Sequence, residues 1–238
     1  IELVCHDVPA AAYELAKEFW PGPLTMILKK SDCVPKSITG GLGTVAIRMP
    51  SYPIALELIR QGGGYIAAPS ANTSGRPSPT TAQHVYEDLQ GKIPMILDGG
   101  AVTIGLESTI VDLTEEIPTI LRPGFISLDM VQAVLGEAQI DRGLIANDSN
   151  IHPKAPGMKY RHYAPKADLK IVEGPMEQVI SYINEQAEKG RTGIICTEET
   201  RSRYPKGDIK CVGTRKDELS IASHLFAVLR EFDEDGVE

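Results

Sequence analysis

The sequence contains no long apolar run, no paired cysteines and no excess of positive charge. No apolar stretch approaches the ~20 residues needed to cross a bilayer, which predicts a protein without a membrane partner. The four cysteines are scattered without a Cys-x-x-Cys pair, which argues against a structural zinc site or a disulfide framework and favours a reducing, cytoplasmic compartment. The formal net charge of −8 argues against a broad nucleic-acid-binding surface.

The most informative segment is the polar loop predicted between Ala67 and Thr80. Its fourteen residues carry five hydroxyls, one amide and one guanidinium, with almost no large apolar group. Small hydroxyl residues let a backbone approach a ligand closely, while Ser, Asn and Arg donate hydrogen bonds to phosphate or carboxylate oxygens. An ordinary surface loop has the same composition, so this segment alone leaves both interpretations open.

Periodicity predicts an α/β layered domain with a twisted sheet in the first part of the chain. Asp7 is expected to cap a helix that reaches Trp20, with Pro9 in its first turn. Ser127 is expected to cap another that ends at Gly136. Further helices are predicted at 53–60 and 80–89, and strands at 24–28, 44–49, 65–68, 95–98, 108–113 and 119–121.

In the last part of the chain, the sequence pattern predicts a small Rossmann-like βα unit. Residues 137–167 lack a clear period and are interpreted as a linker. Strands at 169–172, 193–197 and 209–213 then alternate with helices at 176–189 and 220–232. No Gly-x-Gly-x-x-Gly motif is present, so no dinucleotide is inferred.

Six motifs occur in a fixed order along the chain and together are far more specific than one polar loop. They are the Ala67–Thr80 loop, Phe19-Trp20-Pro21-Gly22-Pro23-Leu24-Thr25, Thr44-Val45-Ala46-Ile47-Arg48-Met49-Pro50, Glu107-Ser108-Thr109-Ile110-Val111-Asp112, Leu121-Arg122-Pro123-Gly124 and Pro156-Gly157-Met158-Lys159-Tyr160-Arg161-His162-Tyr163-Ala164-Pro165. In this order they closely resemble the YrdC/Sua5 family of threonylcarbamoyl-AMP synthases, which start the t6A modification of tRNA.

The resemblance implies a YrdC-like catalytic domain at 1–136, a linker at 137–167 that folds over the site as a lid, and a Sua5 C-terminal domain at 168–238. Family members carry a Lys-x-Arg motif before Phe-Trp-Pro-Gly-Pro, which is not found here. The chain begins with Ile1 and ends in an acidic segment. We therefore expect that it is truncated at both ends, with the first domain lacking its N-terminal part and the last domain incomplete.

The family reaction implied by the resemblance joins L-threonine, bicarbonate and ATP into threonylcarbamoyl-AMP and releases pyrophosphate. Such chemistry depends mainly on positioning and charge stabilisation, so no residue is assigned a covalent or acid–base role. Mg²⁺ is expected to accompany ATP, and a t6A transferase complex is expected to take up the product. The resemblance places Arg48, Ala68 and Ser108 at threonine, and Thr44, Ser70, Asn72, Ser78, Arg122 and Tyr163 at ATP.

The chemistry of several of these residues also indicates what they can bind. The Arg48 guanidinium follows a predicted strand and has the geometry to clamp a carboxylate through two hydrogen bonds. Ser70 and Asn72 are two residues apart, so in an extended segment both side chains face one ligand. Glu107 fits capping or a salt bridge at least as well as catalysis. Asp98 and Asp112 fit turn formation better than magnesium binding, and no histidine is assigned to a metal.

Three classes of function remain open at this stage. The first is the adenylate-forming synthase. The second is a non-catalytic RNA-binding module, which would use the aromatic–basic cluster Lys159–Tyr163 for stacking and explain weak RNA binding, but the acidic balance argues against it. The third is a carbamoyl-transfer domain like those of hydrogenase-maturation proteins, whose acylphosphatase and zinc-finger regions are not found in this sequence.

Overall fold

The structure is a computed structural model, and it describes residues 1–73, 75–145 and 165–237. Tyr163 and the rest of the aromatic–basic cluster lie outside these residues. The described chain forms two compact units, and each is described by itself. Unit 1 holds Ile1–Pro69 and residues 107–145, and unit 2 holds Ser70–Leu106 and residues 165–237. Unit 2 therefore combines the polar loop from Ser70 onward with the C-terminal part of the sequence. The domain boundaries at 136 and 167 stay a prediction.

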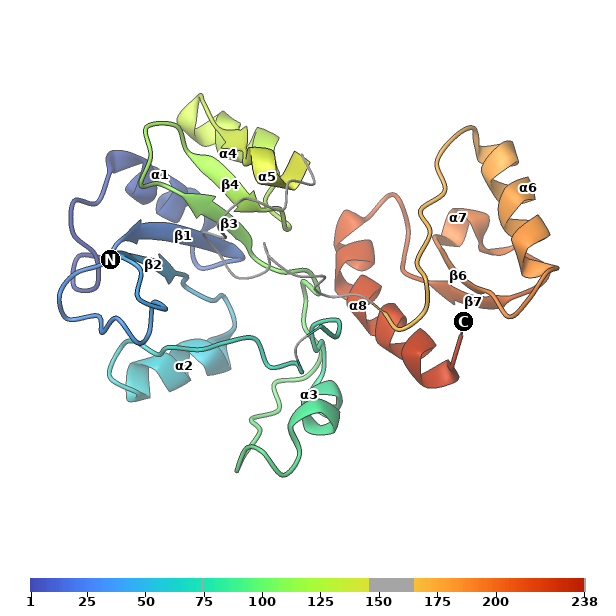
Figure 1. Cartoon of the computed structure of the whole chain (residues 1–238), viewed down its shortest axis with the longest axis horizontal. Helices are drawn as coiled ribbons and strands as arrows, with labels where there is room; N and C mark the ends of the chain where they lie inside the picture. The colour runs from blue at the N-terminus through green and yellow to red at the C-terminus, as the bar shows by residue number, and fades with distance from the viewer. Residues whose placement is uncertain (74, 146–164, 238) are drawn as a thin grey trace. The chain divides into compact units, whose positions relative to one another are not determined.

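Unit 1 is built on a mixed sheet whose described strands have the order β2-β1-β3-β4-β5 (Figure 1). β1 pairs antiparallel with β2 and parallel with β3, while β4 pairs antiparallel with β3 and parallel with β5. The α/β class predicted from the sequence is thereby confirmed. The strands are β1 (Leu24–Lys29), β2 (Thr44–Ile47), β3 (Thr109–Asp112), β4 (Thr119–Arg122) and β5 (Gln139–Ile140).

Alternation along β1 separates the two faces of this sheet. Leu24, Met26 and Leu28 are buried in the main core with Leu15 of α1 (Ala10–Phe19) and Val131 of α4 (Leu128–Leu135). Ile27 instead packs with two residues of β3 and β4 in a second, smaller cluster. The main core therefore lies under α1 and α4, which contact each other, and this layer holds β1 and β3 in place. The shorter helices of unit 1 are α2 (Pro53–Gln61) and α5 (Arg142–Ile145).

Helix ends show where local sequence signals were sufficient. The Ser127 hydroxyl accepts a hydrogen bond from the Met130 amide, and Gly136 ends α4 with a φ of 79°, as predicted. The cap predicted at Asp7 is wrong, because α1 begins at Ala10 after Pro9, which has no side-chain cap bond. Asp7 has a φ of 49°, and its carboxylate faces Lys29 at 3.5 Å and the neighbouring His6 at 3.1 Å.

Unit 2 contains a parallel two-stranded sheet between two helices. α6 (Met176–Ala187) covers one face with Ile180, and α8 (Glu218–Asp235) covers the other with Val228 and Phe232. The βα arrangement predicted for this part of the chain is therefore present. Its strands are β6 (Gly193–Cys196) and β7 (Asp208–Cys211), the short helix between them is α7 (Glu198–Arg201), and the polar loop leads into α3 (Ala82–Leu89).

Three predicted strands are absent from the described residues, namely 65–68, 95–98 and 169–172. Their apolar side chains are largely exposed, with Ile66 at 45%, Met95 at 70% and Ile171 at 83%. Sequence pattern indicated a β-type run in each case, but a strand also requires a neighbour that pairs with its backbone. These runs have no such neighbour in the part of the chain that the structure describes. No helix in that part is long and apolar enough to span a membrane.

Candidate functional site

The sequence-predicted residues fall into two groups, one in each compact unit. Unit 1 holds Thr44, Arg48, Ala68, Ser108 and Arg122. Unit 2 holds Ser70, Asn72 and Ser78, whose loop is described except for residue 74.

In unit 1, a hydrogen-bonded cluster forms where β1, β3 and β4 meet. The Ser108 hydroxyl lies 2.8 Å from the hydroxyl of Thr25, and Arg122 donates to the same Ser108 oxygen at 3.0 Å. Arg122 also donates to the Ser108 carbonyl through Nε and Nη2, at 3.1 and 2.9 Å. The nearby Glu107 carboxylate faces the Arg122 guanidinium at 3.8 Å, in agreement with the salt-bridge interpretation of Glu107. The parallel pairing of β1 with β3 brings these segments together.

Next to this cluster, the backbone at Gly124 packs tightly against the backbone of Glu107 and Thr109. A Cβ at Gly124 would lie 2.3 Å from the Glu107 carbonyl oxygen and 2.7 Å from the Thr109 amide nitrogen. No real side chain tolerates such distances to backbone atoms. The glycine of the Arg-Pro-Gly motif is therefore required for the backbone after β4 to pass against Glu107 and Ser108.

Arg48 follows directly after β2 and differs from Arg122 in its bonding. Among the described residues, no hydrogen bond or ion pair with the Arg48 guanidinium is found, although its environment carries charge. Desolvation lowers the pKa of Arg48, the positive charge of Arg122 lowers it further, and Glu107 opposes both effects. The side chain keeps a solvent-exposed surface, so it is reachable by a ligand despite the protein around it. An accessible guanidinium without an internal partner is chemically suited to bind a carboxylate.

Thr44 and Ala68 complete the group in unit 1. Thr44 is a partly buried residue at the start of β2, opposite Lys29 of β1 in the antiparallel register. Ala68 lies in an exposed segment without regular structure, so its backbone is open to solvent.

In unit 2, Asn72 makes hydrogen bonds within the polar loop itself. The Asn72 amide nitrogen donates to the carbonyls of Thr73 and Arg76, at 3.2 and 3.1 Å. The Asn72 side-chain oxygen has no hydrogen-bond partner among the described residues and is shielded from solvent. Ser70 is exposed and Ser78 partly buried.

Asp88 of α3 holds the polar loop through a hydrogen bond and an ion pair. Its buried carboxylate accepts a hydrogen bond from the Thr73 amide at 3.1 Å and pairs with Arg76 at 2.5 Å and Arg230 at 2.7 Å. Burial alone raises the pKa of Asp88, but hydrogen bonds from Arg230 and Thr73 and the two guanidinium charges outweigh it and hold that pKa below its ordinary value. The Arg230 guanidinium also donates to the Pro77 carbonyl at 2.7 and 3.0 Å.

Sequence reasoning missed Thr25, Asp88 and Arg230. Thr25 belongs to a quoted motif, and its alternation with Leu24 and Met26 places it off the main core, which was a usable signal. Asp88 and Arg230 lie on amphipathic helices far apart in the sequence, and no local pattern pairs them. Asp98 and Asp112 accept hydrogen bonds from the amides of Gly100 and Thr114, which confirms them as turn formers. No cluster of three metal-ligating side chains occurs among the described residues.

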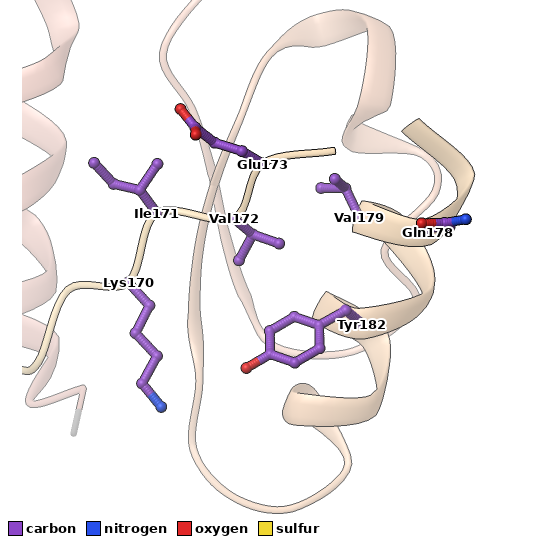
Figure 2. Close-up of a pocket in the computed structure, with 7 residues that line it drawn as sticks. All are labelled: Lys170, Ile171, Val172, Glu173, Gln178, Val179 and Tyr182. Carbon is purple, nitrogen blue, oxygen red and sulfur yellow. The ribbon is translucent and has the colours of Figure 1, made fainter. Parts of the chain in front are cut away.

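A separate groove of about 530 Å³ lies in unit 2, between α6 and the extended segment before it (Figure 2). In Figure 2 the side chains of Val172, Val179 and Tyr182 point toward one another, while Ile171 points away. The lining of this groove includes none of the predicted site residues.

Comparison with known proteins identifies the class and then the branch. Residues 1–124 match the Sua5–YciO–YrdC family model, described under telomere recombination, and residues 126–238 match the C-terminal domain of threonylcarbamoyl-AMP synthase. The chain therefore belongs to the Sua5–YciO–YrdC family, and its second match places it in the Sua5 branch.

The most similar curated relatives include two threonylcarbamoyl-AMP synthases. The one from Pyrococcus abyssi is 46% identical over 243 residues, and the one from Bacillus subtilis is 48% identical over 240. Each match covers all of this chain and 69% of the relative. The crystal structure of P. abyssi Sua5 complexed with L-threonine matches 99% of this chain and 69% of that one, with a TM-score of 0.90 and 47% identity. These matches confirm the family and fold predicted from the motifs.

Proposed function

We propose that this chain provides the catalytic framework of a threonylcarbamoyl-AMP synthase. The observation that carries this proposal is the similarity over the whole chain to two proteins of that name, together with a close structural match to a Sua5 bound to L-threonine. The reaction joins L-threonine, bicarbonate and ATP, and its product serves the t6A modification of tRNA. The enzyme is thus a nucleotidyltransferase.

The chemistry makes three demands on the protein. Threonine must be held by its carboxylate and side chain while its amine is neutral enough to take up CO2 derived from bicarbonate. A carbamate oxygen must then form a bond to the α-phosphorus of ATP in line with the bond that breaks. Pyrophosphate leaves with the electron pair of that bond. No covalent enzyme intermediate is required, so positioning and charge stabilisation supply the catalysis.

Threonine is proposed to bind at the group in unit 1. Arg48 would receive the carboxylate, since its guanidinium is accessible and no partner of it is found in the described structure. Ser108 would contact threonine through a hydroxyl whose position is fixed by Thr25 and Arg122. The exposed backbone at Ala68 would complete the contacts. A rigid hydroxyl loses little entropy on binding, which favours affinity.

ATP is proposed to contact Thr44, Arg122, Ser70, Asn72, Ser78 and Tyr163. The support is the position of these residues in the family motifs, with Tyr163 outside the described residues. Mg²⁺ is proposed to arrive bound to the phosphates, which suits an ion that keeps its own waters and takes few protein ligands.

The remaining partners are also proposals. A t6A transferase complex would consume the adenylate, because a mixed carbamic–phosphoric anhydride is a reactive donor that must be passed on. A cytoplasmic location and weak RNA binding are consistent with this role. The RNA-binding module without catalysis stays the alternative, although the net charge of −8 argues against a broad RNA surface.

The test of the function is substrate-dependent pyrophosphate release by the natural protein. We expect release from ATP only when threonine and bicarbonate are both present. Equal release with serine, or without any amino acid, would remove threonine as the substrate. Binding of single-stranded RNA without any pyrophosphate release would favour the alternative.

A further inference from the structure

We propose that Arg230, on the last helix of the chain, positions the polar loop for nucleotide binding. This inference rests on the proposed function, because it takes Ser70, Asn72 and Ser78 as the ATP-binding part of that loop. It extends the proposal by giving the C-terminal family domain a specific task. Arg230 is a positioning residue, since it acts through the loop backbone.

The first observation is that Arg230 spans two parts of the loop region at once. Its Nη2 and Nη1 donate to the two Asp88 carboxylate oxygens at 2.7 and 3.3 Å, and its Nε and Nη2 donate to the Pro77 carbonyl. The side chains of Arg230 and Asp88 are both fully buried. Such an arrangement uses the planar fork of a guanidinium, which a lysine ammonium does not reproduce.

The second observation is where these bonds act along the loop. Asp88 accepts from the amide of Thr73, which directly follows Asn72. Arg230 holds the carbonyl of Pro77, which directly precedes Ser78. Two proposed ATP contacts are thus each adjacent to a backbone group that the buried pair fixes. Because side-chain direction follows from the backbone, loss of the pair would misplace both.

The third observation is the division of α8 into two faces. Val228 and Phe232 pack against the two-stranded sheet of unit 2, as in any helix that covers a sheet. Ala222 and Arg230 are eight residues apart and share another face. The Ala222 carbonyl accepts from the Gly105 amide at 3.1 Å, and a Cβ at Gly105 would lie 2.8 Å from that carbonyl. Through Arg230 this face contacts Pro77, near the start of the segment from 70 to 106, and through Ala222 it contacts Gly105, at the end of that segment.

The two sides of this contact match different family models. Asp88, Pro77 and Gly105 belong to the part of the chain that matches the Sua5–YciO–YrdC model, and α8 belongs to the part that matches the C-terminal domain. A buried ion pair is costly to desolvate and adds little net stability over a well-packed apolar pair. Its stronger contribution here is to orient the loop through directional hydrogen bonds.

The experiment compares R230K and R230Q in the natural protein, with R203Q as the matched control. Arg203 lies in the same C-terminal domain and makes an ion pair with Glu177 at the surface. For each variant, the melting temperature, the KM for ATP, kcat for pyrophosphate release and the calorimetric Kd for threonine are measured. R230K keeps a positive charge beside Asp88 but cannot hold the Pro77 carbonyl and both carboxylate oxygens together.

We expect R230K to fold, to bind threonine like the wild type and to raise the KM for ATP about tenfold or more. R230Q should raise it further and lower the melting temperature, and R203Q should change nothing. An unchanged KM for ATP in R230K would overturn the proposal. Loss of folding or of threonine binding in R230K would do so as well, because Arg230 would then be a general structural residue. Failure of the wild type to release pyrophosphate would instead refute the proposed function.

Discussion

Arg48 and Arg230 represent two uses of the same side chain in the two units of this molecule. Arg230 is completely buried, and its donors are taken by Asp88 and Pro77. Arg48 is exposed at its surface, and the described structure shows no partner for its guanidinium. A guanidinium whose donors are bonded to other protein groups holds those groups in place, whereas a guanidinium without such bonds can bind a ligand. Arg230 is thus a structural arginine, and Arg48 keeps its proposed role as a threonine contact.

The largest effect is expected from removing the Asp88 charge, which the buried Arg230 guanidinium shares with the partly exposed Arg76. D88N leaves Arg230 and Arg76 without their shared counter-charge, and breaking a buried pair on one side costs about 3–5 kcal/mol of unfolding free energy. Urea unfolding checks this. The control is E177Q, which removes the carboxylate from an exposed pair with Arg203 and should leave stability nearly unchanged. Equal stability of both variants would mean that the buried pair contributes no more than a surface one.

The second effect concerns the open arginine. R48A should weaken threonine binding about a hundredfold, because hydrogen bonds to charged groups contribute about 1.5–3 kcal/mol each. Its melting temperature should hardly change, since no internal bond of the guanidinium is lost. Calorimetric titration with threonine measures the affinity. R60A on α2 serves as the control, because the partner of Arg60 in the described structure is the exposed Glu57 of the same helix. Unchanged threonine affinity in R48A would assign Arg48 a structural role.

The same comparison explains what sequence reasoning could and could not reach. Arg48 could be proposed as a threonine contact because it lies in a short motif, and the strand before it has a local pattern. Arg230 was missed because its partner Asp88 is 142 residues away and both lie on helices whose polarity looks ordinary. The helix ends at Ser127 and Gly136 needed only local chemistry and were predicted correctly. The strand predicted at 65–68 depended on a pairing neighbour, which no local pattern reveals.

A third, smaller effect is expected from the hydrogen bond between the Thr25 and Ser108 hydroxyls in unit 1. T25V removes one of the two hydrogen-bond partners of the Ser108 hydroxyl while keeping the side-chain volume, and Arg122 remains as the other. The loss of one neutral hydrogen bond corresponds to about 1 kcal/mol, or roughly fivefold in threonine affinity. T39V is a suitable control, because the hydrogen bonds of the Thr39 hydroxyl in the described structure lie within its own turn. An effect of T25V on ATP and not on threonine would move Ser108 to the nucleotide.

The smallest effect is a pH dependence of unit 2. His84 is partly buried beside the polar loop, and its Nδ1 accepts from the Thr80 amide at 3.2 Å, which requires the neutral ring. Desolvation lowers the pKa of His84 from its ordinary value of 6.5, and the charge of Arg230 lowers it further. The charges that oppose this shift are those of Glu87, Glu234 and Asp88.

Because the unfolded chain binds the proton more readily than the folded one, this contribution is present above pH ~6.5 and is lost as the pH falls below it. We therefore expect the free energy of unfolding to be lower at pH 5.5 than at pH 7.5. H84Q keeps an acceptor near the Thr80 amide but cannot titrate, so it should reduce that difference. The two proteins are compared by urea unfolding at both pH values. If H84Q shows the same pH dependence as the wild type, the proton is taken up elsewhere, and the neutral His84 does not stabilise the loop that Arg230 holds.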